Sequence, residues 1–134
     1  MSIKGVEIRE LKVLGDERGN FFEFLRKEYA NLSDFGQIYI TTAYPGKAKG
    51  NHYHKRKIEW FCVIKGDGEL VLKDKNSGEQ EIIKMGDSNK VVVKIPANVL
   101  HAIKNVGQDT LYLLAYISEP YNEEDPDTYK EELI

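Results

Sequence analysis

Turn-forming residues recur along this chain at short intervals, and their spacing limits what the chain can fold into. Between them lie segments rich in β-branched and aromatic residues, such as FGQIYITTAY (35–44) and KVVVKIP (90–96). These segments are typical of strands, and no stretch carries the 3.6-residue repeat of a long helix. Many short strands joined by Gly- and Asn-rich turns predict an all-β sandwich or barrel. The turn segments are DERGN (16–20), YPG (44–46), GDG (66–68), NSG (76–78), MGD (85–87) and NVGQD (105–109).

Size and charge narrow the class of protein further. A length of 134 residues fits one domain, and we expect residues 1–134 to share a single hydrophobic core. The net charge of −3 argues against nucleic acid or an anionic membrane as a partner, and no run approaches the about 18 apolar residues of a membrane span. The one cysteine, Cys62, lies in the apolar run WFCVI, so a buried thiol and a cytoplasmic location are predicted.

Two strand segments are apolar on both faces: WFCVI (60–64) and LYLLAYI (111–117). Such a strand is either enclosed in a core or covered by another subunit, and in so small a domain the second option predicts a homodimer. Residues 1–30 are then an N-terminal arm and strand, candidates for exchange between subunits. Residues 119–134 are acidic, contain two prolines and predict an irregular arm at the surface.

The three histidines and one glutamate form the pattern that carries chemistry. His52 and His54 are two apart, so on a strand their rings project from the same face. If the basic run Lys55–Lys57 is a turn, Glu59 opens the next, antiparallel strand beside them, and His101 follows a later turn. Three imidazoles and one carboxylate suit one divalent metal ion, zinc first, with manganese, iron, cobalt or nickel as alternatives.

The spacing of these residues raises the metal site above a chance match. A lone HxH is weak, because most histidines on strands are ordinary core or surface residues. Here G-x5-H-x-H-x4-E-x6-G begins at Gly46, and P-x4-H-x3-N runs from Pro96 to Asn105. Together they resemble the two motifs of the cupins, which implies a double-stranded β-helix, or jelly-roll barrel, with its metal-binding region at 46–105. Asn98 stands where the family usually has Gly, and Asn is the next-best residue for a left-handed turn.

Longer segments carry a more specific resemblance, from about Val6 to Tyr129. DERGNFFEFLRKE, KGNHYHKRKIEWF, IPANVLHAIKNVG and DPDTY are similar to the C-terminal cupin domain of bifunctional epimerase/reductases that act on a UDP-linked 4-keto sugar in capsular polysaccharide biosynthesis. The chain is more distantly similar to dTDP-4-dehydrorhamnose 3,5-epimerases and dTDP-hexose ketoisomerases. This implies an epimerase or isomerase that acts α to the ketone of a nucleoside-diphosphate 4-keto-6-deoxy sugar. The capsular enzymes carry a fused reductase, so a separate reductase is the partner expected here.

The same resemblance suggests catalytic residues. The histidine that matches His52 is the base in the rhamnose-type enzymes, but a metal-bound imidazole is a poor base, so we rank His52 first as a ligand. Lys49 is expected to meet the diphosphate or the developing oxyanion, unless it is an ordinary surface lysine. The acid of the family is usually a tyrosine. The candidates are Tyr39, Tyr44, Tyr53, Tyr112 and Tyr116, of which we favour Tyr44 and Tyr112.

Two residues of the DERGNFF segment are candidates for substrate binding. Arg18 resembles a residue that reaches across the dimer to the partner's nucleotide site, although the segment also reads as an ordinary turn. Phe21, or its neighbour Phe22, is placed to stack on a nucleotide base, although most such phenylalanines lie in a core or interface.

Two other functions fit a cupin with these ligands. One is an oxygenase or small-molecule isomerase whose open metal positions bind O2 or an organic acid; Fe(II) with oxygen uptake would indicate it. The other is a non-catalytic module that binds a nucleotide sugar and partners a reductase, for which deuterium exchange into the sugar is the discriminating measurement.

Overall fold

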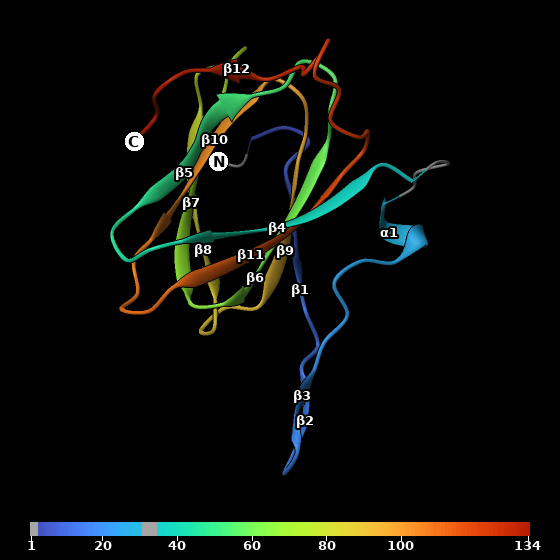
Figure 1. Ribbon diagram of the computed structural model, residues 1–134, viewed down its shortest axis with the longest axis vertical. Helices are drawn as coiled ribbons and strands as arrows, with labels where there is room; N and C mark the ends of the chain where they lie inside the picture. The colour runs from blue at the N-terminus through green and yellow to red at the C-terminus, as the bar shows by residue number, and fades with distance from the viewer. Residues whose placement is uncertain (1–2, 31–34) are drawn as a thin grey trace.

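The computed structural model describes residues 3–30 and 35–134, and strands dominate it (Figure 1). Two five-stranded antiparallel sheets make the body. The first runs β1 (Glu7–Glu10), β9 (Val91–Ile95), β6 (Glu59–Lys65), β11 (Leu111–Ile117) and β4 (Gln37–Ala43). The second runs β12 (Tyr129–Lys130), β5 (Ala48–Tyr53), β10 (Val99–Asn105), β7 (Asp67–Asp74) and β8 (Gln80–Gly86). The prediction of an all-β jelly-roll barrel is confirmed.

The main core lies between the two sheets. Alternate side chains of facing strands, such as Leu70 and Leu72 of β7 and Val93 of β9, are fully buried there. Successive side chains of a strand point to opposite faces, so every second residue of these strands faces the core. The one helix of the described residues, α1 (Lys27–Ala30), is a single turn, and no helix among them is long and apolar enough to span a membrane.

A second apolar cluster lies on the outer face of the first sheet. Trp60 and Cys62 of β6 are buried there with Tyr116 of β11, and the chain's own N-terminal segment covers them through residues such as Phe22 and Leu25. Burial also raises the pKa of the Cys62 thiol to about 11, so this cysteine stays protonated. The expectation that another subunit covers β6 is therefore wrong for this strand, because residues 11–30 already do so.

The edge of the same face remains uncovered. Ile38 and Ile40 of β4 and Tyr112 of β11 lie on the outer side of the sheet and are exposed, with 61% of Ile40 accessible. A hairpin of β2 (Leu14–Asp16) and β3 (Gly19–Phe21) projects away from the barrel with every residue of both strands exposed (Figure 1). The first strand, β1, pairs with β9.

The C-terminal arm is more ordered than the sequence suggested. Its residues Tyr129 and Lys130 form β12, which pairs with Tyr53 and His52 of β5. The arm therefore extends the second sheet beside the histidines. The other residues of the arm, 119–128 and 131–134, lie outside helices and strands, and only β12 was not expected, since a two-residue strand carries too little pattern to be read from sequence.

Candidate metal centre and cavity

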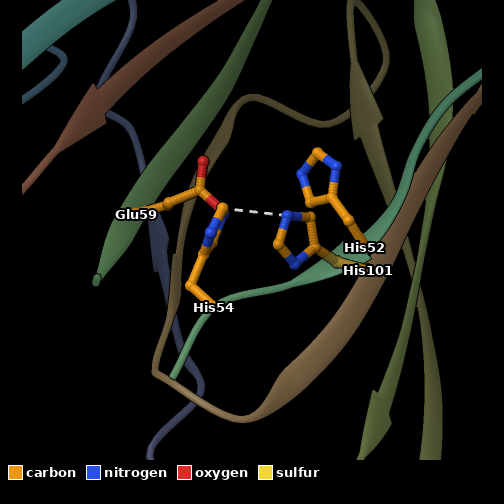
Figure 2. Close-up of side chains that lie close together, drawn as sticks. All are labelled: His52, His54, Glu59 and His101. Atoms are coloured by element: carbon orange, nitrogen blue, oxygen red, sulfur yellow. Dashed lines mark ion pairs between the residues drawn. The ribbon is translucent and has the colours of Figure 1, made fainter. Parts of the chain in front are cut away.

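The four predicted ligands meet between the two sheets. His52 is the penultimate residue of β5, and His54 directly follows that strand. Glu59 is the first residue of β6, and His101 lies in β10. One ligand atom from each residue lies within 4.8 Å of the others, and Figure 2 shows all four side chains turned toward one point.

The connection from His54 to Glu59 differs from the predicted hairpin. The chain does bend at Lys55 and Arg56, as expected. However, β5 and β6 belong to different sheets, so Glu59 reaches the histidines from across the barrel. The strand beside β5 is β10, where His101 is the register partner of His52. The sequence therefore predicted the wrong neighbour for β5, with Glu59 in place of His101. Sequence spacing reveals a turn but not the sheet that the next strand joins.

Two residues with left-handed backbone conformation, Asn98 and Gly50, bring the strands that carry the histidines together. Asn98, which precedes β10, has φ of 64°, so the left-handed turn predicted for it is present. Its amide donates to the carbonyl of His54 at 2.6 Å. Gly50 has φ of 101°, and a Cβ at this position would lie 2.8 Å from the carbonyl oxygen of His101. Only glycine allows β5 to approach β10 this closely, next to the bulge between His101 and Ala102.

The hydrogen bonds of two imidazoles define which nitrogen faces the centre. His54 donates from Nδ1 to the carbonyl of Asp127 at 2.6 Å, and His101 donates from Nδ1 to the carbonyl of Val99 at 3.0 Å. Each neutral ring therefore directs the lone pair of Nε2 inward. These nitrogens lie 2.8 and 3.0 Å from Oε1 of Glu59 (Figure 2).

The three inward atoms lack hydrogen-bond partners. Nε2 of His54, Nε2 of His101 and Oε1 of Glu59 are buried, and none makes a hydrogen bond of acceptable geometry. Electron pairs that face one another in a buried site repel unless a cation lies between them. The residues therefore fit a divalent ion bound by nitrogen and oxygen donors, with no thiolate.

The pKa values of Glu59, His54 and His52 are shifted by burial and by the charges of the cluster. Burial would raise the pKa of Glu59, but His101 and His54 outweigh it and hold the pKa well below its usual range. Burial likewise would lower the pKa of His54, but the Glu59 carboxylate and the Asp127 carbonyl raise it above its ordinary value. Burial, reinforced by the adjacent His101, lowers the pKa of His52 to about 4. His52 thus stays neutral near pH 7, as a ligand must.

A cavity of about 150 Å³ opens beside the cluster. It is smaller than the about 300–1,000 Å³ of most small-molecule pockets, so it suits one sugar ring and not a whole nucleotide sugar. Its polar lining includes Tyr39 and Thr41 of β4, with Lys49 of β5, the strand that also carries His52. Nζ of Lys49 donates to Oγ1 of Thr41 at 2.7 Å. The remaining lining residues are Gly50, His52, Phe61, His101, Ile103 and Leu113.

Tyr39 is the tyrosine that the structure brings to the ligands. Its hydroxyl donates to Oε2 of Glu59 at 3.5 Å, and burial together with the Glu59 charge raises its pKa, so the phenol remains a donor. The two favoured tyrosines lie elsewhere. Tyr112 has opposite parity to the cavity-lining Leu113 and faces outward, and Tyr44 is 69% exposed in the turn after β4. Strand parity could not be assigned from sequence, because β11 carries large apolar residues on both faces and β4 directs Ile38 and Ile40 outward.

The remaining candidates divide between the cavity and the surface. Lys49 lines the cavity, as described above. Arg18 and Phe21 lie on the projecting hairpin, where Arg18 pairs with Asp16 at 2.6 Å and Phe21 is exposed. Neither lines the cavity of its own chain. Sequence reasoning missed Asp127, although the DPDTY segment that contains it was among those that carried the resemblance.

The fold and the four-residue cluster define a cupin barrel. A family model described as the polysaccharide biosynthesis C-terminal domain matches residues 14–129, and the chain belongs to this family. The resemblance read from the sequence segments is thereby confirmed.

Two relatives illustrate the range of the family. The spore coat polysaccharide biosynthesis protein SpsL of Bacillus subtilis (strain 168) is 32% identical over 130 residues, which cover 93% of this chain and 86% of SpsL. The UDP-2-acetamido-2,6-beta-L-arabino-hexul-4-ose reductase of Pseudomonas aeruginosa is 36% identical over 115 residues. That match covers 85% of this chain but 29% of the reductase, so this chain corresponds to one part of a longer protein.

Solved structures share the fold. The dTDP sugar isomerase of Desulfovibrio desulfuricans G20 has a TM-score of 0.88 at 22% identity, with 97% of this chain and 85% of the isomerase covered. The capsular polysaccharide assembling protein CapF of Staphylococcus aureus has a TM-score of 0.71 at 32% identity, with 92% of this chain and 34% of CapF covered.

Proposed function

We propose that this chain is a metal-binding sugar-nucleotide epimerase or isomerase that acts α to the ketone of a nucleoside-diphosphate 4-keto-6-deoxy sugar. The observation that carries the proposal is the pairing of two features in one cavity. His52 and His101 of the candidate ligand cluster line the cavity, and the protic groups of Tyr39 and Lys49 line it as well. Proton transfer beside a carbonyl needs both an acid-base pair and stabilisation of the enolate.

The relatives support this chemistry. SpsL is named for polysaccharide biosynthesis, and a relative from Haloferax volcanii, 30% identical over 133 residues, is named a probable low-salt glycan biosynthesis epimerase. The isomerase from Desulfovibrio desulfuricans is named for a dTDP sugar. The Pseudomonas relative is named a reductase, and the match covers 29% of it, so a reductase remains the partner that we propose in the pathway.

The roles within the cavity follow from position and charge. His52, His54, Glu59 and His101 would hold one divalent ion, zinc in preference to manganese, iron, cobalt or nickel. When bound, the ion supplies Lewis-acid stabilisation of the enolate oxygen. Because His52 is committed as a ligand and has a pKa of about 4, it is a poor general base at neutral pH. Proton transfer then needs two other groups: the neutral amine form of Lys49 would remove the proton α to the ketone, and the phenol of Tyr39 would return a proton to the enolate.

The size of the cavity places the rest of the substrate outside it. With the sugar beside the ligands, the diphosphate lies at the mouth, where the exposed stem of Lys49 enters. The nucleoside then reaches the molecular surface, where a second subunit can contribute the hairpin with Arg18 and Phe21. We therefore retain the homodimer, supported by the exposed apolar face of Ile38, Ile40 and Tyr112. The cytoplasmic location expected from the sequence stays a prediction.

Deuterium wash-in tests the proposal. The zinc-loaded protein is incubated in D2O with UDP- and dTDP-linked 4-keto-6-deoxyhexoses, and exchange at each carbon α to the ketone is followed by NMR. We expect enzyme-dependent incorporation at one or both positions, and none above background with Glu59→Gln. No exchange into any of these sugars by the metal-loaded protein would overturn the proposal, and oxygen uptake by the Fe(II) form would indicate an oxygenase instead.

A further inference from the structure

The C-terminal arm is hydrogen-bonded along β5, the strand that carries His52. Beyond the two pairs of β12, the amide of Glu131 donates to the carbonyl of Asn51 at 3.0 Å. Oδ1 of Asn51 in turn accepts from the amides of Leu133 at 2.7 Å and Ile134 at 3.1 Å. The arm is thus fixed along β5, the strand that carries His52 and leads into His54.

Asp127 is the buried residue of this arm, with 3% of its surface accessible. Its carboxylate accepts three backbone hydrogen bonds, each of 3.0 Å, from the amides of Lys55, Arg56 and Lys57. Its φ of 49° is left-handed, a conformation that Asp and Asn adopt more readily than most residues. Three charge-assisted bonds to consecutive amides form an anion nest that closes the turn between His54 and Glu59.

The same residue contacts a ligand directly. The main-chain carbonyl of Asp127 accepts the Nδ1 hydrogen of His54 at 2.6 Å. This bond selects the tautomer whose Nε2 faces Glu59, and it fixes the plane of the ring. Because the carboxylate anchors Asp127 to the turn, it also fixes the position of the carbonyl. One residue thereby sets the ring of His54 and the path of the chain that delivers Glu59.

We propose that Asp127 is a positioning residue for the metal centre: its carboxylate closes the 55–57 turn while its carbonyl orients the imidazole of His54. The inference rests on the proposed function, since it assigns Asp127 a purpose in metal binding. It also makes the C-terminal arm part of the site. A protein without a docked arm would retain His52 and His101 on the ladder, but it would lose the support of His54 and Glu59.

Three variants separate positioning from general support of the fold. Asp127→Ala removes the nest and disfavours the left-handed backbone. Asp127→Asn keeps that backbone preference and one acceptor oxygen but removes the charge. Glu131→Gln is the matched control, because Glu131 lies on the same arm as Asp127. It weakens the ion pair between Glu131 and Lys75 but does not alter the 55–57 turn or His54. Thermal unfolding in the presence of a chelator verifies that each variant folds.

Two readouts are measured on the full-length protein. Zinc affinity is determined by competition with a chromophoric chelator, and the Co(II) form is examined by its d–d absorption. We expect Asp127→Ala to bind zinc about 10- to 100-fold more weakly with an altered cobalt spectrum, Asp127→Asn to show a smaller loss, and Glu131→Gln to match the wild type. The tautomer of His54 is determined by ¹⁵N NMR in metal-free protein at pH 8.5, where the wild type should carry hydrogen on Nδ1 and Asp127→Ala should show a mixture.

The outcomes distinguish this inference from the proposed function. Wild-type zinc affinity, cobalt spectrum and His54 tautomer in a folded Asp127→Ala protein would overturn the positioning role while leaving the metal site intact. The same would follow if Glu131→Gln produced an equal loss of zinc affinity. If the wild type binds no metal but Asp127→Ala still shifts the tautomer, the metal site fails and the orientation of His54 by Asp127 stands.

Discussion

His52 and His101 are register partners across the β5–β10 ladder, and their rings meet edge to face with centroids 4.7 Å apart. These two ligands are therefore fixed by the hydrogen bonds of a sheet. His54 and Glu59 depend instead on the connection between the sheets. The centre consequently has a rigid half and a half whose geometry relies on local contacts, and substitutions should affect the two differently.

Glu59 supplies the only negative charge of the cluster, and we predict that Glu59→Gln loses metal binding while it keeps the fold. An amide of the same shape can donate to one of the unpartnered imidazole nitrogens, so the free energy of unfolding of the metal-free protein should change by no more than about 1 kcal/mol. Zinc affinity should fall more than about 100-fold, beyond the loss typical of residues that only support ligands.

The measurement is thermal unfolding with and without zinc. Binding to the native state raises the Tm of the wild type, whereas the Tm of Glu59→Gln should not respond to zinc. Glu123→Gln, a substitution at an exposed position of the C-terminal arm, is the control and should behave as the wild type. An equal zinc response in Glu59→Gln would exclude Glu59 as a ligand.

Metal affinity should decrease as pH falls, and His54 should dominate the first part of this decrease. A ligand must be deprotonated to bind, and the raised pKa of His54 means that a proton competes with the metal already near neutral pH. The lowered pKa of His52, about 4, delays its competition to much lower pH. Titration of zinc affinity between pH 5 and 8 should show an affinity that rises with pH. A pH-independent affinity over this range would contradict the assignment.

The cluster of His52, His54, Glu59 and His101 was predictable from sequence because it depends on residue identity and spacing. Two histidines at i and i+2, a glutamate after a basic turn and a histidine after a proline leave few other arrangements. The sheet to which each ligand belongs was not predictable. That assignment depends on whether the chain crosses the barrel at 55–58, and the residues that make it cross, above all Asp127, lie 70 positions away, as the hydrogen bond to Lys57 shows.

The positions of the two favoured tyrosines were mispredicted for a related reason. Tyr39 alternates with Ile38 and Ile40, so in this part of the strand the two isoleucines point outward, and Tyr39 and Thr41 point into the cavity. This reverses the usual pattern, since a strand normally directs its apolar face toward the core. The inversion occurs where one face lines a polar cavity and the other forms an exposed apolar surface.

We predict that Tyr39→Phe slows proton transfer strongly and preserves the metal site. The hydroxyl is a protonated donor on the cavity wall, 3.5 Å from a ligand oxygen of Glu59, and removal of a general acid typically costs about 10²- to 10⁴-fold in rate. Deuterium wash-in should fall by this factor with zinc affinity unchanged. Tyr44→Phe and Tyr112→Phe, which alter hydroxyls outside the cavity, serve as controls. A loss with Tyr112→Phe equal to that of Tyr39→Phe would reverse the assignment.

The last prediction concerns the exposed face of β4. If a second subunit covers it, Ile40→Lys places an unpaired charge in the interface and should weaken the dimer at least about tenfold, because interface residues that matter cost more than about 1 kcal/mol. Ile82→Lys is the matched control: Ile82 is 63% exposed, close to Ile40 at 61%, but lies on β8 of the other sheet. Sedimentation velocity over a range of concentrations measures both. A monomeric wild type, or equal weakening by Ile82→Lys, would show that the face of β4 is not the dimer interface, and Arg18 and Phe21 would then have no partner site to reach through it.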